Sequence, residues 1–234
     1  MEAPRMRVLF DRPYIFVDRR EAGQLLADML QEYTFRRPVV VGIPRGGLVV
    51  AAEIARRLNA ELDFIMPKKL GAPGNPELAI GAITERGHMV LNEEAILYLG
   101  VPESYIQEEA RRKLEEIVAR TRHYRQVLPH VPFEGRSVIL VDDGVATGST
   151  MRAAVQAARA ENPAEVVLAL PVAPRDTFES LAHLADLTVA VTAPEDFWGG
   201  VGAYYQDFRQ VSDAEVLAIL EAFQRGQKGE EEAE

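Results

Sequence analysis

A strand-turn-helix-strand pattern that occurs twice constrains the fold of this chain more than any other feature. Its first copy starts with PVVVGI at residues 38–43, which has no polar position and is typical of a strand buried on both faces. A glycine pair, a helical pattern and a second predicted strand, ELDFIMP, follow. The second copy starts with SVILV at residues 137–141 and ends in the strand EVVLALPV. Such βαβ units predict an α/β domain with a parallel sheet.

Two segments between the copies break this pattern. Residues 68–77, KKLGAPGNPE, are rich in glycine and proline and predict a mobile loop. Residues 102–126 form a long, highly charged helical pattern with one apolar stripe. We therefore expect a single domain over residues 1–234 with a helical insertion at 93–126. The acidic end of the chain, residues 225–234, predicts a disordered tail.

The composition excludes several classes of function. Acidic side chains number 36 and basic ones 26, and the formal charge of -10 argues against a nucleic-acid partner. The absence of cysteine excludes disulfides, thiolate metal sites and cysteine nucleophiles. No apolar run is long enough for a membrane span and no signal peptide is seen, so we expect a cytoplasmic protein without membrane contact. The four histidines are scattered and share no metal-like spacing.

Two adjacent aspartates, Asp142 and Asp143, end the apolar run in VILVDDGVATGST at residues 138–150. The carboxyl ends of parallel strands face the ligand crevice of such a sheet, so both carboxylates should lie there. The loop after them leads into a helix, whose N-terminal amides favour an anion. A ribose 5-phosphate would suit both parts of this site. Its vicinal hydroxyls would donate to the carboxylates, and its phosphate would bind to the loop. The alternative is a plain strand-to-helix turn with solvated aspartates. An ATP-binding loop of the form Gly-x4-Gly-Lys-Ser/Thr does not occur.

VILVDDGVATGST resembles the phosphoribosyl pyrophosphate (PRPP) motif of the type I phosphoribosyltransferases, in which four hydrophobic and two acidic residues precede a phosphate loop. The resemblance implies a Rossmann-like core with a hood. It also implies that Asp142 and Asp143 hold the ribose 2- and 3-hydroxyls. The 5-phosphate would then bind to the loop residues Gly144, Val145, Ala146, Thr147, Gly148, Ser149 and Thr150.

Two other segments are similar to parts of the same family. The turn after the first core strand resembles the family's pyrophosphate loop, which would offer backbone amides and one guanidinium from Pro44, Arg45, Gly46 and Gly47. Lys68 and Lys69 stand where the family carries a flexible loop that closes over the reaction, and either would contact pyrophosphate. The alternative for the first segment is a helix-entry turn with a surface arginine. The alternative for the second is two solvated lysines at a loop edge.

The late segment DFWGGVGAYYQDFRQ resembles that of purine salvage enzymes, in which an aromatic ring stacks on the base and an arginine approaches pyrophosphate. By position, Phe197 or Trp198 would be the acceptor-binding ring and Arg209 the arginine. A core aromatic beneath the sheet edge is the alternative for Trp198. Ala173 stands where purine enzymes place a lysine that reads the 6-oxo group, which speaks against a 6-oxopurine acceptor.

The resemblance implies transfer of the 5-phosphoribosyl group of PRPP to a nitrogenous acceptor, such as a nucleobase, with release of pyrophosphate. Positioning and electrostatic stabilisation of the leaving diphosphate would carry catalysis, through Arg45, Lys68, Lys69, Asp142 and Asp143. Mg²⁺ would arrive bound to PRPP and touch the two aspartates directly or through water. A homodimer is also implied. One alternative is a regulator that binds PRPP or a nucleotide without turnover. Another, a phosphate-recognising hydrolase, lacks a positioned nucleophile or metal cluster.

Overall fold

The computed structural model describes residues 5–231, whose centre is a sheet of six parallel strands. The strand order is β1-β9-β8-β7-β2-β3, and every neighbouring pair is parallel, which confirms the predicted parallel α/β core. The strands are β1 (Met6–Phe10), β2 (Val39–Gly42), β3 (Glu61–Phe64), β7 (Ser137–Val141), β8 (Glu165–Val172) and β9 (Leu187–Thr192).

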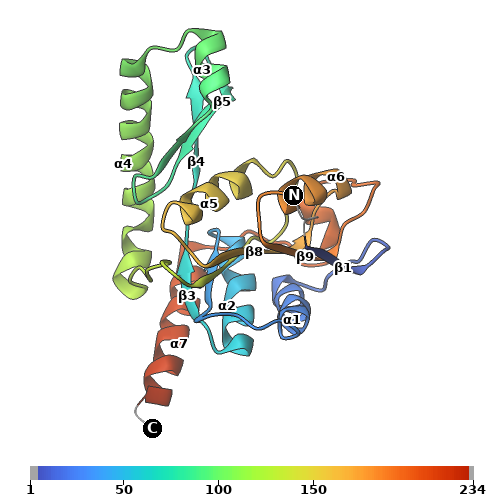
Figure 1. The fold of residues 1–234 in the computed structure, drawn as a ribbon. Coiled ribbons are helices and arrows are strands. Elements are labelled where there is room, and N and C mark those ends of the chain that lie inside the picture. Colours follow the sequence, from blue (N-terminus) through green and yellow to red (C-terminus); the bar gives the residue numbers. More distant parts are fainter. Residues whose placement is uncertain (1–4, 232–234) are drawn as a thin grey trace.

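Helices cover both faces of this sheet, and the apolar strands separate two cores (Figure 1). Alternate residues of β7 point to opposite sides, as strand geometry requires. Ile139 and Val141 belong to the core with α1, α2 and α7, whereas Val138 and Leu140 belong to the core with α5 and α6. The helices are α1 (Arg19–Leu30), α2 (Gly46–Leu58), α5 (Ser149–Arg159), α6 (Arg175–Ala182) and α7 (Asp213–Glu231), with a 3-10 turn, η1 (Val201–Tyr204), before α7.

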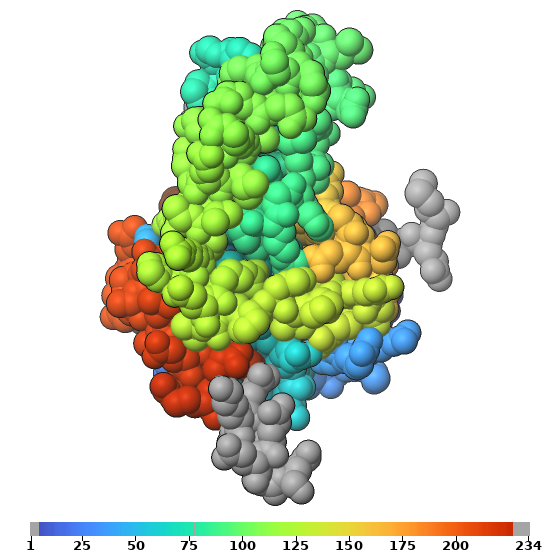
Figure 2. All heavy atoms as spheres, turned by 90° about the vertical axis from the view of Figure 1, so that its left-hand side faces the viewer, coloured from blue at the N-terminus to red at the C-terminus, as the bar shows by residue number. Residues whose placement is uncertain are grey.

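A second, antiparallel sheet and two helices form an inserted subdomain, residues 68–127, that projects from the core (Figure 2). Its apolar cluster includes Leu70, Ile80, Ile106 and Ile117, so strands and helices share one small core. The insertion is therefore wider than the expected helical segment. Its elements are β4 (Lys68–Ala72), β5 (Asn75–Ile83), β6 (Met89–Leu91), α3 (Glu93–Leu99) and α4 (Glu103–Val127).

The prediction of a mobile loop at residues 68–77 is wrong, because β4 and β5 form a hairpin there. Of the glycines that suggested flexibility, Gly74 lies in the hairpin turn at φ 73°, whereas Gly71 and Gly81 serve close backbone packing. A Cβ on Gly71 would lie 2.6 Å from Cα of Pro76, and one on Gly81 would lie 2.4 Å from the carbonyl oxygen of Val90. A strand that needs glycine for close approach looks like a loop in a single sequence.

A buried charge cluster joins the inserted subdomain to the core. Asp63 of β3 is fully buried; it lies 2.8 Å from Nδ1 of His130, accepts a hydrogen bond from the backbone of Val131 and pairs with Arg125. Arg125 also donates to Glu85 at 2.8 Å. Burial alone would raise the pKa of Asp63, but the hydrogen bond with His130 and the charge of Arg125 outweigh it and lower that pKa. The cluster fixes where α4 meets the sheet.

The C-terminal helix α7 runs to Glu231 and so extends into the acidic segment predicted to be a disordered tail, residues 225–234. Residues 232–234 lie outside the described part of the chain. Within residues 5–231, no helix combines the length and the apolar character that crossing a membrane requires.

Candidate active site

The candidate site lies where the chain changes direction across the sheet. From β2 the chain passes through α2 to the edge strand β3, whereas from β7 it passes through α5 to β8 on the other side. Gly42 pairs with Val141, so β2 and β7 end at the same level. In open α/β sheets, ligands bind in the crevice outside such strand ends. The two loops that begin there are the arginine loop, residues 44–47, and the aspartate loop, residues 142–150.

The arginine and aspartate loops are packed directly against each other. A Cβ on Gly46 would lie 1.9 Å from Oδ2 of Asp143, and one on Gly47 would lie 2.9 Å from the carbonyl oxygen of Val141. Neither position has room for a side chain. The two motifs that the sequence placed about a hundred residues apart therefore form one site, in which the backbone of α2 begins against the carboxylate pair.

The two aspartates have different surroundings. Oδ2 of Asp143 accepts a hydrogen bond from Nε of Arg19 at 2.7 Å, and its backbone carbonyl accepts one from the Tyr205 hydroxyl at 2.6 Å. Oδ1 of Asp142 accepts from the backbone N–H of Asp143 at 2.8 Å. Burial and the neighbouring charge of Asp143 raise the pKa of Asp142 well above its usual range. The pair thus offers carboxylate oxygens at the crevice, with one member held by a cation.

The rest of the aspartate loop presents backbone and hydroxyl groups at the start of α5. Gly148, at φ 78°, directs the chain into a helix whose N-terminus has no side-chain cap and no acidic residue in its first turn. Thr147 and Ser149 are exposed, and their hydroxyl oxygens lie 3.3 Å apart. A contact with α6 stabilises the loop, because the Thr177 hydroxyl donates a hydrogen bond to the carbonyl of Ala146 at 3.1 Å. An uncapped helix start of this kind suits an anion.

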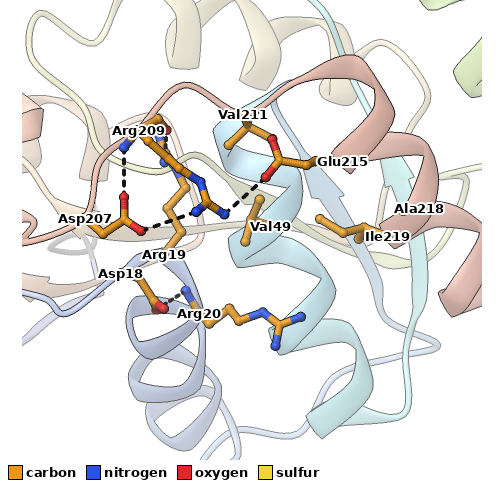
Figure 3. A pocket seen from close by; sticks show the side chains of 10 residues that line it. All are labelled: Asp18, Arg19, Arg20, Val49, Asp207, Arg209, Val211, Glu215, Ala218 and Ile219. Carbon is orange, nitrogen blue, oxygen red and sulfur yellow. Dashed lines mark hydrogen bonds and ion pairs between the residues drawn. The ribbon is translucent and has the colours of Figure 1, made fainter.

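Both arginines predicted to contact pyrophosphate extend toward the first turn of α7. Nη1 of Arg45 lies 3.7 Å from Asp213, a carboxylate that also accepts a hydrogen bond from Tyr124 of the inserted subdomain. Nη2 of Arg209 lies 3.2 Å from Glu215 (Figure 3). The Arg209 side chain is 72% exposed and lines a cavity of about 310 Å³ between α1, α2 and α7, apart from the aspartate pair. Its backbone carbonyl, however, accepts from Arg19 at 2.9 Å.

The two lysines at the start of β4 have different positions. Lys69 lines a cavity of about 530 Å³ between the inserted subdomain and α5, together with Ser149, Thr150 and Arg152. Lys68 is its neighbour along the strand, so its side chain points to the other face of that sheet. The structure therefore brings Lys69, but not Lys68, to the cavity that the aspartate loop borders.

The late segment lies over the aspartate loop through its own aromatic cluster. Phe197 stacks on Tyr204 at a centroid distance of 5.2 Å, and Trp198 lies 5.4 Å from the same ring. Trp198 is 53% exposed, which contradicts the alternative of a core aromatic. Val201 packs on Gly144, where a Cβ would approach it to 2.3 Å. Phe197 and Trp198 thus belong to the segment that covers one side of the carboxylate pair.

Comparison with known proteins identifies the family. A family model described as a phosphoribosyl transferase domain matches residues 18–207. The chain belongs to the phosphoribosyl transferase family. It is similar to a protein of known crystal structure, TT1426 from Thermus thermophilus, with 48% identity and a TM-score of 0.82 over 89% of this chain and 99% of that one.

Two relatives from Mycobacterium tuberculosis, strains CDC 1551 and H37Rv, share the name "Putative phosphoribosyl transferase". Each is 41% identical over 211 residues, which make up 90% of this chain. The chain spans only 47% of the length of each relative. The function of those longer proteins as a whole therefore cannot be assigned to this chain.

Two residues of the candidate site were missed by sequence reasoning. Arg19 lies 124 positions before its partner Asp143, in what reads as the ordinary start of a surface helix. Tyr205 lies in an aromatic segment in which no spacing distinguishes it from its neighbours. Burial and the charge of Asp143 raise the pKa of Tyr205 well above its usual range, so its hydroxyl stays a donor. Only the fold reveals either contact.

Proposed function

We propose that this phosphoribosyl transferase uses PRPP as its donor and transfers the 5-phosphoribosyl group to a nitrogenous acceptor, with release of pyrophosphate. The observation that carries the proposal is the direct contact between the arginine loop and Asp143 at the meeting point of β2 and β7. That contact places three kinds of group within one crevice: carboxylates that accept hydrogen bonds from hydroxyl groups, an uncapped helix start and a second amide-rich loop. PRPP carries a diol, a 5-phosphate and a diphosphate, and so needs all three.

The proposed binding mode follows from the chemistry of these groups. Asp142 and Asp143 accept hydrogen bonds from the ribose hydroxyls, which donate most strongly to charged acceptors. The 5-phosphate lies on residues 144–150, where the start of α5 supplies N–H groups and a favourable dipole. The diphosphate lies on the arginine loop, where the start of α2 supplies backbone N–H groups and a favourable dipole and Arg45 supplies a guanidinium.

The transfer itself breaks the bond from C1 of the ribose to the diphosphate oxygen and forms a bond from C1 to the acceptor nitrogen. Diphosphate leaves with the bonding electron pair, and the nitrogen gives up its proton to solvent water. Positive charge develops on the sugar ring while negative charge grows on the leaving group, so amides and cations aimed at the diphosphate lower the barrier. Lys69 and Arg45 are the cations that can take this role once their side chains turn toward the diphosphate.

Magnesium belongs to the proposed substrate complex rather than to the protein. Within residues 5–231, no group of three or more acidic or histidine side chains could hold a metal ion. Two adjacent carboxylates, of which Asp143 is already paired with Arg19, suit contact with an ion carried by the diphosphate. The substrate is therefore Mg²⁺-PRPP, with Asp142 as the better placed contact.

The acceptor is proposed to be a nucleobase or another planar nitrogen compound, because Trp198 presents a half-exposed ring beside the segment that covers Asp143. One observation favours a second candidate, a PRPP- or nucleotide-binding regulator without turnover. Arg45 and Arg209 are both paired with carboxylates of α7 and not aimed at the crevice.

The experiment is to incubate the protein with PRPP, Mg²⁺ and a panel of bases and amines and to measure pyrophosphate. Release that depends on one acceptor supports the transferase. Tight PRPP binding without release for any acceptor would favour the regulator, and no PRPP binding at all would refute both.

A further inference from the structure

Arg19 has an unusual set of contacts for the first residue of a helix. Its side chain is only 10% exposed, and its Nε donates to Oδ2 of Asp143 at 2.7 Å. Its Nη1 donates to the carbonyl of Arg209 at 2.9 Å, and its guanidinium lies 4.0 Å from the centre of the Phe208 ring. A guanidinium that is nearly buried, stacked and bonded on two sides has one available orientation.

The segment that Arg19 bonds is itself fixed to the start of α1. The backbone of Phe16 donates to the carbonyl of Tyr204 at 2.8 Å and accepts from the N–H of Gln206 at 2.8 Å. The Tyr205 between them donates its hydroxyl to the carbonyl of Asp143 at 2.6 Å. Asp143 is therefore held from two sides, by Arg19 on its carboxylate and by Tyr205 on its backbone.

We propose that Arg19 is a positioning residue of this site, which holds the Asp143 carboxylate in the orientation that accepts a ribose hydroxyl and links it to residues 204–209. The inference rests on the proposed function, because the ribose is the ligand of that carboxylate. Arg19 does not touch the reacting atoms. It acts through Asp143, and it connects the donor site to the segment that carries Phe197 and Trp198.

The neighbouring residue provides a matched control. Arg20 lies on the same helical turn and lines the α1-α2-α7 cavity in Figure 3, and among residues 5–231 its guanidinium has no ion pair. Arg20→Met removes the same charge and the same side-chain donors one position away. The two variants share helix propensity and net charge, so a difference between them reports the contact with Asp143 and Arg209.

The test is a calorimetric titration of wild type, Arg19→Met, Arg19→Lys and Arg20→Met with Mg²⁺-PRPP at neutral pH, together with thermal unfolding. We expect Arg19→Met to weaken PRPP affinity by roughly tenfold or more. A purely structural role would lower the melting temperature but leave the PRPP affinity of the folded protein unchanged at a temperature well below it.

Arg19→Lys keeps the charge but cannot reproduce the bonded fork, so its affinity should fall between those of wild type and Arg19→Met. It carries the test if the Met variant does not fold. Arg20→Met should match wild type. Wild-type affinity in both Arg19 variants would overturn the role of Arg19 alone, whereas a wild-type protein that binds no PRPP would overturn the proposed function and this inference with it.

Discussion

Gly46→Ala is the substitution that most sharply tests the contact between the two loops. A methyl group at this position would lie 1.9 Å from Oδ2 of Asp143 and 2.7 Å from Nε of Arg19, far inside van der Waals contact. Either the start of α2 or the Asp143-Arg19 pair must move. Because the methyl lies against both partners of the 2.7 Å hydrogen bond, we expect that bond to break.

The magnitude follows from two opposing terms. Alanine in place of a helical glycine stabilises by about 0.5–1 kcal/mol where space is free. Loss of a hydrogen bond between charged groups costs about 1.5–3 kcal/mol. The net destabilisation is then about 1–2 kcal/mol, which in a domain of this size lowers the melting temperature by roughly 2–8 °C. Displacement of Asp143 should also weaken PRPP binding.

A matched control exists in α7. Gly226 is a helical glycine at which an added methyl group would meet nothing within 4 Å, so Gly226→Ala should stabilise slightly and leave PRPP binding unchanged. Thermal unfolding and a PRPP titration of both variants complete the assay. If Gly46→Ala behaves like Gly226→Ala in both measurements, the two loops do not touch as described and the reasoning fails.

Three further variants test the proposed ribose site, the arginine loop and the buried charge cluster. Asp142→Asn together with Asp143→Asn should weaken PRPP binding greatly, and near-wild-type titration would refute the ribose assignment. Arg45→Ala should lower turnover or pyrophosphate affinity, and no change in either steady-state quantity would remove Arg45 from the site. Asp63→Asn, which breaks a buried charge cluster, should cost about 3–5 kcal/mol of unfolding free energy in chemical denaturation. Because the folded pKa of Asp63 is lowered, its contribution is present above the unfolded pKa of about 3.9 and is lost as pH falls through the folded value, so only the wild type should show that acid loss.

The parallel sheet and the aspartate loop could be predicted because each is specified by residues that are close together in the sequence. Four apolar residues before Asp142 and small residues after it specify a buried strand, a crevice position and a helix start without reference to distant residues. The arginine loop was proposed from its resemblance to the family's pyrophosphate loop, because a glycine pair alone is also typical of an ordinary helix-entry turn. Its contact with Asp143 was not, since a close approach depends on strand order.

The rest of the site depends on long-range packing. The Arg19 contact spans 124 positions and leaves no periodic signal at either end. The β4-β5 hairpin resembles a loop in the sequence because Gly71 and Gly81 lower the strand propensity. Glycine is required at both positions because another part of the backbone lies too close for a side chain. The pairing of Arg45 with Asp213 likewise depends on where α7 docks, which no local pattern of the sequence specifies.

The central claim is that the crevice between the ends of β2 and β7 holds Mg²⁺-PRPP. A crystal structure of the protein with Mg²⁺-PRPP tests it most directly. We predict that the ribose hydroxyls lie on Asp142 and Asp143, the 5-phosphate on residues 144–150 and the diphosphate beside Gly46. PRPP bound elsewhere, for example in the cavity lined by Arg209 between α1, α2 and α7, with the aspartate pair free of it, would contradict the claim.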